Sequence, residues 1–100
     1  MPTATVTTTA RDVYFGTSDL SALTFRNGSL SGVLYLRNKK SSGTTVSLSE
    51  YDHSLRPGDA LGFTKAVDGD GIAGPWEAIA DAGSITLEIL LVYDGDRRRR

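Results

Sequence analysis

The chain contains no cysteine, one histidine and one tryptophan among its 100 residues. The absence of cysteine excludes a disulfide framework and a thiolate metal site. A single histidine also excludes an ordinary structural zinc site within one chain, because such a site takes about four nitrogen or sulfur ligands. A domain of this size must therefore depend on one hydrophobic core for its stability.

Long apolar runs and nucleotide motifs are missing as well. No run approaches the roughly 20 apolar residues that span a bilayer, and the first residues lack the basic and apolar regions of a signal peptide. There is no glycine-rich phosphate loop followed by Lys-Ser or Lys-Thr, and no dinucleotide fingerprint. We therefore expect a protein made in the cytoplasm, with no membrane partner and no cofactor.

The lone histidine raises the question of catalysis, because Asp52 and Ser54 flank His53. Neighbouring side chains on an extended chain point to opposite sides, so these three residues cannot form a catalytic triad with one another. We interpret His53 as a loop residue near the turn at Pro57-Gly58. The carboxylates are scattered at turns, and we interpret them as charges that keep the surface soluble. Since neither they nor His53 form a catalytic arrangement, we expect the protein not to be an enzyme.

The net charge of −1 hides an asymmetry along the chain. Four of the eleven basic residues form a basic C-terminal tail at 97–100, which leaves seven basic against twelve acidic groups in residues 1–96, a charge of −5. Adjacent guanidinium groups stay solvated unless an anionic partner binds them. Such a partner can be nucleic acid, an acidic protein surface or the acidic residues 1–96 of this chain. Contacts to phosphate alone carry no base information, so we expect no sequence-specific nucleic-acid recognition.

The composition favours β structure. Apolar residues make up 39% and charged residues 23%, which is typical of a folded domain. Threonine, serine and glycine are abundant, and stretches rich in helix-forming residues are missing. The predicted fold is all-β, a β-sandwich or jelly-roll-like domain of about seven short antiparallel strands over residues 1–96.

In the first half of the chain, residues 3–10 alternate small apolar and hydroxyl side chains. This segment predicts either a strand or an extended arm over residues 1–10. Asn27-Gly28 is the strongest short hairpin signal in the chain, because both residues tolerate a positive φ. It predicts a hairpin whose returning strand covers residues 29–37, with three leucines on one face: Leu30, Leu34 and Leu36.

The middle of the chain carries two weaker patterns. Val46 and Leu48 indicate a short strand after a polar, basic loop. The Pro57-Gly58 pair predicts a turn, in which proline presets φ and glycine supplies the left-handed position. The strand that follows should direct Leu61 and Phe63 inward.

The last third predicts a long loop over residues 65–74 and a clear strand over residues 84–93. Residues 75–83 between them fit a short helix or a strand, and we favour the strand because the Ala-Gly pair at its end makes a turn. The strand at 84–93 is apolar on both faces, since Leu90 and Val92 lie on its second face. We therefore expect it to be central in a sheet or to lie in an interface.

One acidic loop resembles a calcium site. On the spacing of an EF-hand loop, Asp68, Asp70, Gly71 and Glu77 fall on positions three, five, six and twelve, but Ala66 occupies position one. The flanking sequence is also strand-like. We favour a turn-rich loop, and we expect no metal site.

Four segments carry a family resemblance: ATVTTTA at 4–10, GVLYLRN at 32–38, RPGD at 56–59 and ITLEILLVYD at 85–94. They look like segments of small all-β virion proteins of tailed bacteriophages and gene transfer agents, closest to capsid-decorating proteins such as cement proteins and the bases of head spikes or fibres. The resemblance implies a structural protein on the capsid exterior of a virion. It also implies a symmetric homo-oligomer, such as a pentamer, that contacts capsid protein and a spike or fibre protein.

Two functional hypotheses follow. In the first, the protein assembles through its strands and termini, and the interface residues are Thr5, Val6, Thr7, Thr8, Leu90, Val92, Arg97, Arg98, Arg99 and Arg100. In the second, it is a carbohydrate- or ligand-binding β-sandwich that uses Tyr51, Trp76 and the loop at 68–71. Trp76 could stack on a sugar, although a lone tryptophan in a small domain is more often part of the core.

Overall fold

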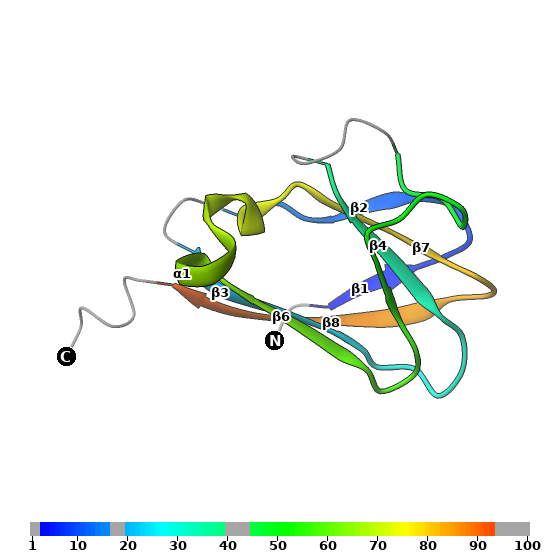
Figure 1. Cartoon of the computed structure of the whole chain (residues 1–100). Helices are drawn as coiled ribbons and strands as arrows, with labels where there is room; N and C mark the ends of the chain where they lie inside the picture. The colour runs from blue at the N-terminus through cyan, green and yellow to red at the C-terminus, as the bar shows by residue number, and fades with distance from the viewer. Residues whose placement is uncertain (1–2, 17–19, 40–44, 94–100) are drawn as a thin grey trace.

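Two four-stranded antiparallel sheets pack face to face in the computed structural model, which describes residues 3–16, 20–39 and 45–93 (Figure 1). Sheet 1 consists, in spatial order, of β1 (Thr3–Val6), β8 (Ile85–Tyr93), β3 (Leu20–Asn27) and β6 (Ala60–Thr64). Sheet 2 consists of β2 (Arg11–Tyr14), β7 (Trp76–Ala80), β4 (Leu34–Asn38) and β5 (His53–Leu55). Two short helices, α1 (Lys65–Asp68) and η1 (Asp70–Ala73), connect β6 to β7. Neither is long or apolar enough to cross a membrane.

The strand pairs are nested. β1 pairs with β8, β2 with β7, β3 with β6, and β4 with β5, as if one long hairpin had been rolled up. Further pairs, β3 with β8 and β4 with β7, close each sheet. This is the strand order of a jelly roll. The predicted all-β sandwich is confirmed, with eight strands where about seven were expected.

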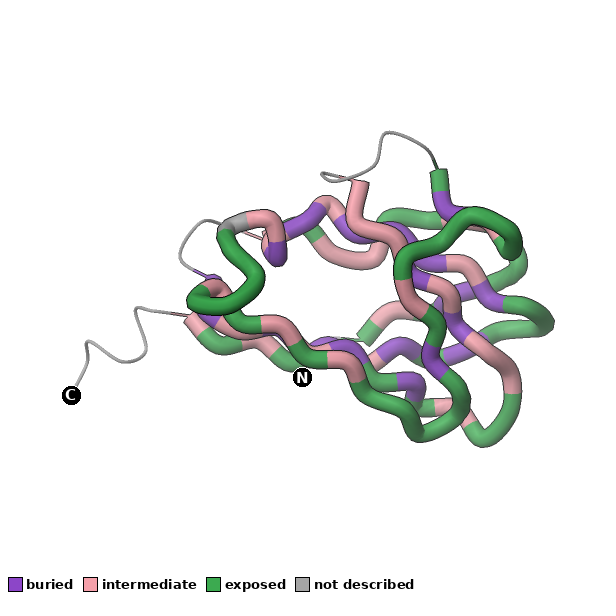
Figure 2. The backbone as a smooth tube through the Cα atoms, viewed as in Figure 1, coloured by how far each residue is buried: buried purple, intermediate pink, exposed green. Residues whose placement is uncertain are grey.

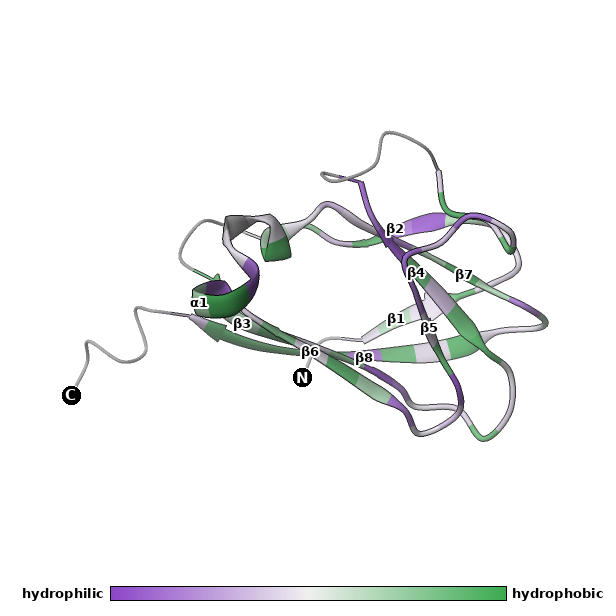
Figure 3. Ribbon diagram, viewed as in Figure 1, coloured by the Kyte–Doolittle hydropathy of each residue, from purple (hydrophilic) through white to green (hydrophobic). Residues whose placement is uncertain are grey.

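The core lies between the sheets and is built from alternate residues of each strand (Figures 2 and 3). Phe25 of sheet 1 meets Trp76 of sheet 2 edge to face, with ring centroids 5.1 Å apart. Successive side chains of a strand point to opposite faces of the sheet. Every second residue of each strand therefore faces this core. The completely buried apolar residues in the described part of the chain are Val6, Leu23, Phe25, Leu34, Leu36, Ala78, Ala80 and Leu87.

The strand predicted over residues 84–93 is confirmed as β8, and its central position in a sheet is as expected. β8 lies between β1 and β3 and is central in sheet 1. Its first face is buried at Ile85, Leu87 and Ile89, whereas Leu90 and Val92 point away from the core and are each 42% exposed. The strand prediction for the preceding segment is also confirmed, since β7 directs Trp76 into the core.

The predicted Asn27-Gly28 hairpin is wrong. β3 ends at Asn27, but β4 belongs to the other sheet, so residues 28–33 connect the two layers. Neither Asn27 nor Gly28 has a positive φ. Asn27 is instead fully buried, and its side chain bonds to three backbone groups of the surrounding loops. Leu30, expected on the apolar face of a strand, is completely exposed in this loop.

Three expectations for the middle of the chain need correction. Val46 and Leu48 do not lie in a strand. Val46 is buried, whereas Leu48 is half exposed. His53 lies in β5 rather than in a loop, since it continues the ladder opposite Leu36. The long loop expected at 65–74 contains α1 and η1.

Other local predictions hold. Gly58 has a φ of 83°, as the Pro-Gly turn requires, and β6 directs Leu61 and Phe63 toward the core. Of the two alternatives for the N-terminal segment, residues 3–6 form a strand that pairs with β8 of the same chain.

Candidate functional site

A cleft of about 330 Å³ opens where β5 of sheet 2 and β6 of sheet 1 form the free edges of the sandwich. α1 and η1 close one end of it. Because β5 and β6 pair on one side only, the two layers are not joined by hydrogen bonds across this edge. The residues that line the cleft are Asn38, Asp52, His53, Phe63, Asp68, Gly71, Ile72 and Trp76.

Three aromatic rings form the wall and floor of the cleft. His53 and Phe63 approach one another across the gap between the sheets, with centroids 5.4 Å apart and the rings edge to face. Trp76 lies behind both, with its centroid 5.1 Å from that of Phe63 and 6.2 Å from that of His53. Trp76 is only 2% exposed, and its indole N–H donates to the carbonyl of Ile72 at 2.7 Å. The accessible aromatic surface therefore belongs to His53 and Phe63, which are half-buried.

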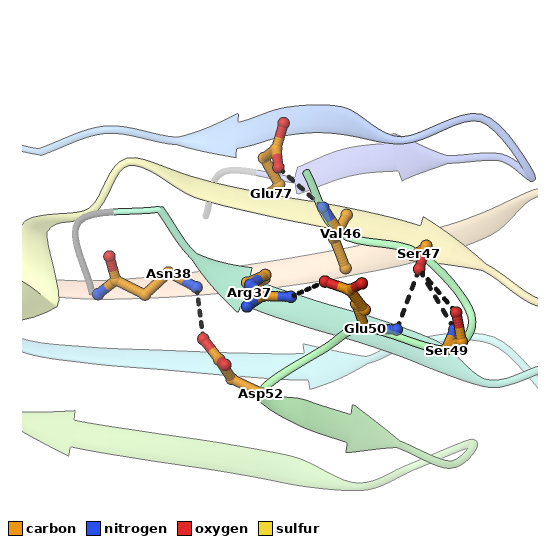
Figure 4. Close-up of polar contacts among 8 residues, drawn as sticks. All are labelled: Arg37, Asn38, Val46, Ser47, Ser49, Glu50, Asp52 and Glu77. Atoms are coloured by element: carbon orange, nitrogen blue, oxygen red, sulfur yellow. Dashed lines mark hydrogen bonds and ion pairs between the residues drawn. The ribbon is translucent and has the colours of Figure 1, made fainter. Parts of the chain in front are cut away.

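Two carboxylates stand at the rim. Asp52 Oδ2 accepts a hydrogen bond from the backbone N–H of Asn38 at 3.0 Å, which Figure 4 shows. Asp68 Oδ2 accepts one from the backbone N–H of Thr64 at 2.9 Å. Within the described residues, the Oδ1 atom of each carboxylate has no donor. Both side chains are exposed, and the described residues of the lining include no lysine or arginine.

The side chains flanking His53 do not converge on it. Ser54 lies opposite Tyr35 in the β5–β4 ladder, whereas His53 lies opposite the inward-facing Leu36. The carboxylate of Asp52 is bonded to the backbone of Asn38. The environment of the imidazole is thus aromatic, as in a binding surface.

Two residues of the spacing that resembles an EF-hand, Asp68 and Glu77, bond to separate partners. Glu77 lies in β7, where its carboxylate accepts from the backbone N–H of Val46 at 3.1 Å (Figure 4). The same carboxylate approaches Lys39 Nζ at 3.5 Å. Asp68 is bonded to Thr64 instead. In the part of the chain that the structure describes, no group of three or more acidic, histidine or cysteine side chains could hold a metal ion.

The outer face of sheet 2 is covered by the chain that follows β4. Val46 is buried on this face, and Glu77, only 6% exposed, bonds to its backbone. Arg37 pairs with Glu50 at 3.4 Å, and Tyr51 stacks against Tyr35 with centroids 4.6 Å apart. Tyr51, which the sequence suggested as a ligand contact, therefore lies on this covering layer and does not line the cleft.

The outer face of sheet 1 carries no such cover in the described residues. Leu90 and Val92 of β8 lie beside Thr24 and Ala22 of β3 in the strand register, and Gly62 of β6 follows next to Thr24. We call these five residues the apolar face. At its border Arg26 and Glu88 form an ion pair with a distance of 2.7 Å.

The predicted interface residues fall into three groups. Thr5, Thr7 and Thr8 are exposed, and Leu90 and Val92 form the centre of the apolar face. Val6, unlike the others, is completely buried in the core of this chain. The tail at 97–100 lies outside the described residues.

The cleft could not be found from the sequence, because its lining comes from six elements, and the sequence singles out Asp52, His53, Trp76 and the loop at 68–71 without bringing them together. The ring of Phe63 was predicted to face inward, but nothing in the sequence places it beside His53. A comparison with protein-family models, with curated proteins and with solved structures finds no match to this chain.

Proposed function

We propose that this protein is a non-enzymatic structural subunit that self-associates through the apolar face and serves as a capsid decoration or a head spike or fibre base of a phage-like particle. The observation that carries the proposal is the exposure of Leu90 and Val92 at the centre of a regular sheet. Apolar groups gathered on one surface commonly mark a site of protein–protein contact.

The apolar face is suited to packing against a second sheet. Around the two large side chains it presents Ala22, Thr24 and Gly62, whose small size lets another layer approach to the roughly 10 Å that separates packed sheets. β8 is central, so the contact would involve side chains and would leave the backbone ladder intact.

A second copy of this chain is the occupant that the charges favour. Arg26 and Glu88 lie together at the border of the face, so the same patch carries one positive and one negative group. In a twofold contact, each patch meets its own copy. Arg26 of one subunit can then approach Glu88 of the other without any change in the net charge that is buried.

The jelly roll supports the same role by analogy of fold alone, since this architecture recurs in viral capsid domains and also in lectins. The resemblance of the four segments to capsid-decorating proteins points in the same direction. Attachment to capsid, spike or fibre subunits would use surfaces outside the apolar face.

Native mass spectrometry and sedimentation velocity at micromolar concentration test the proposal. We expect a discrete oligomer, and we expect Leu90→Lys to weaken its assembly at least tenfold, because the charge would be buried in the contact. Leu30→Lys is the matched control, since Leu30 is fully exposed in a loop away from the face. A strict monomer that also has no affinity for capsid, spike or fibre subunits would overturn the proposal.

A further inference from the structure

We infer that the cleft between β5 and β6 binds a guanidinium group, presented by an arginine side chain. This inference concerns a different surface from the apolar face and is independent of self-association. It is built from the charge of the cleft, the nature of its walls and the geometry of its acceptors.

The charge of the lining selects a cation. Asp52 and Asp68 contribute two negative charges, and among the described residues no lysine or arginine lines the cleft to neutralise them. An anionic ligand would meet both carboxylates, and the described lining holds no lysine or arginine to compensate their charge. A cation gains from both, and it gains more in a cleft with apolar walls than on an open surface, because the local dielectric constant is lower.

The walls favour a flat cation. The half-buried rings of His53 and Phe63 border a space of about 330 Å³, with Trp76 behind them. Cations are attracted to the faces of aromatic rings, and guanidinium stacks on them better than a compact ammonium does. A sugar would need an open ring face of its own, and Trp76, the best candidate in the sequence for such stacking, is almost wholly buried.

The cleft offers carboxylate acceptors to a guanidinium group, which carries N–H donors only. Asp52 and Asp68 each hold one oxygen in place through a backbone N–H, so the carboxylates are oriented before any ligand arrives. The Oδ1 atoms have no donor among the described residues and remain able to accept. Charge-assisted bonds of this type are stronger than neutral ones.

The chain itself contains a source of this chemistry, the four arginines at 97–100. Tyr93 ends β8, and its hydroxyl lies 3.4 Å from that of Tyr14, whose strand neighbour is Trp76 in the cleft. Figure 1 shows the end of β8 at the same end of the molecule as α1, which contributes Asp68. The two candidate sources of the guanidinium group are this tail and an arginine of another protein.

Titration with an acetylated and amidated tetra-arginine peptide tests the inference, because Trp76 is the only tryptophan and reports directly on the cleft. We expect a saturable change in its emission. Asp52→Asn and Asp68→Asn keep the backbone hydrogen bond but remove the charge, and each should weaken binding about three- to tenfold. Phe63→Leu, which keeps apolar volume but removes the ring, should weaken it as well.

Asp12→Asn is the matched control. Asp12 is exposed on β2, away from the cleft, and its substitution makes the same change in net charge. We expect this variant to bind within about twofold of the natural chain, as expected for a distant surface charge under screening. Equal weakening by Asp12→Asn and by the cleft variants would mean non-specific attraction and would overturn the inference.

The source of the guanidinium group is tested in the full chain by replacing all four arginines at 97–100 with glutamine. If this chain supplies the group, the glutamine variant binds the peptide more tightly than the natural chain at high salt, where the change in net charge is screened and the removal of an internal competitor remains. If another protein supplies it, the two bind equally. The absence of a saturable response in the glutamine variant, or a response to a neutral hexose alone, would overturn the inference.

Discussion

Replacement of Asn27 by alanine should destabilise the domain strongly, although the sequence places this residue at an ordinary turn. The Nδ2 group of Asn27 donates to the carbonyls of Gly32 at 3.1 Å and Leu55 at 3.0 Å. Its Oδ1 accepts from the backbone N–H of Ser29 at 3.0 Å. One side chain thus joins the β3–β4 connection to the end of β5, and so joins sheet 1 to sheet 2.

The magnitude follows from the three backbone groups that lose their partner. The bond to Leu55 is buried, and a buried group left without a partner costs about 1–3 kcal/mol. The bonds to Gly32 and Ser29 are partly buried, so water recovers some of their loss. We expect a total of about 3 kcal/mol, which corresponds to a fall in melting temperature of roughly 12–24 °C for a domain of this size.

Urea unfolding followed by Trp76 fluorescence measures this change, with Gly28→Ala as the paired variant. Gly28 does not have a positive φ, and an added Cβ would lie 2.9 Å from Glu88 Oε2, the mobile end of a side chain. We expect a loss of less than about 1 kcal/mol, the usual scale of a disturbed surface ion pair.

A two-residue hairpin turn predicts the opposite ranking. In that turn Asn27 would be exposed and its replacement by alanine nearly neutral, whereas alanine at Gly28 would be strained by about 1–2 kcal/mol in a left-handed conformation. A Gly28→Ala variant less stable than Asn27→Ala would therefore refute our account of this connection.

Two further predictions concern stability. Glu77→Ala should cost about 1–3 kcal/mol, because it leaves the buried N–H of Val46 without an acceptor, whereas Glu77→Gln keeps an acceptor and should cost less; equal losses in chemical denaturation would contradict this role. Gly58→Ala should cost about 1–2 kcal/mol, since φ is 83° and the added Cβ meets nothing within 4 Å. Gly74→Ala combines a φ of 90° with a Cβ placed 2.7 Å from the backbone nitrogen of Trp76, and should cost roughly 3 kcal/mol or more; thermal unfolding that ranks the two glycines equally would count against the packing described here.

The elements that could be predicted from sequence are those in which local pattern and tertiary environment agree. The alternation over 84–93 gave the correct faces of β8, because a strand in the middle of a sheet keeps its period along its whole length. The Pro-Gly turn before β6 was also predictable, since glycine at position 58 meets a purely local demand.

The wrong predictions occur where a contact between residues distant in sequence overrides the local conformational preference of the chain. Asn27-Gly28 has the local signature of a turn, but the buried Asn27 side chain gains three hydrogen bonds only when β4 joins the opposite sheet. The sequence around Val46 predicts a strand, but the backbone N–H of Val46 donates to the carboxylate of Glu77, thirty-one positions later, and not to the backbone of a neighbouring strand. The cleft could not be predicted for the same reason, because His53 and Phe63 meet only after the sandwich has closed.

The two sheets differ in how their outer faces are treated, and this difference bears on function. On sheet 2, Val46 and the Glu50–Arg37 and Tyr51–Tyr35 contacts cover the face with the protein's own chain. On sheet 1, the described residues leave Leu90 and Val92 exposed. A jelly roll needs apolar side chains only between its layers, so these two residues add nothing to the core. In the oligomer that we propose, a second copy of the same face removes them from water, and this burial supplies the gain in free energy.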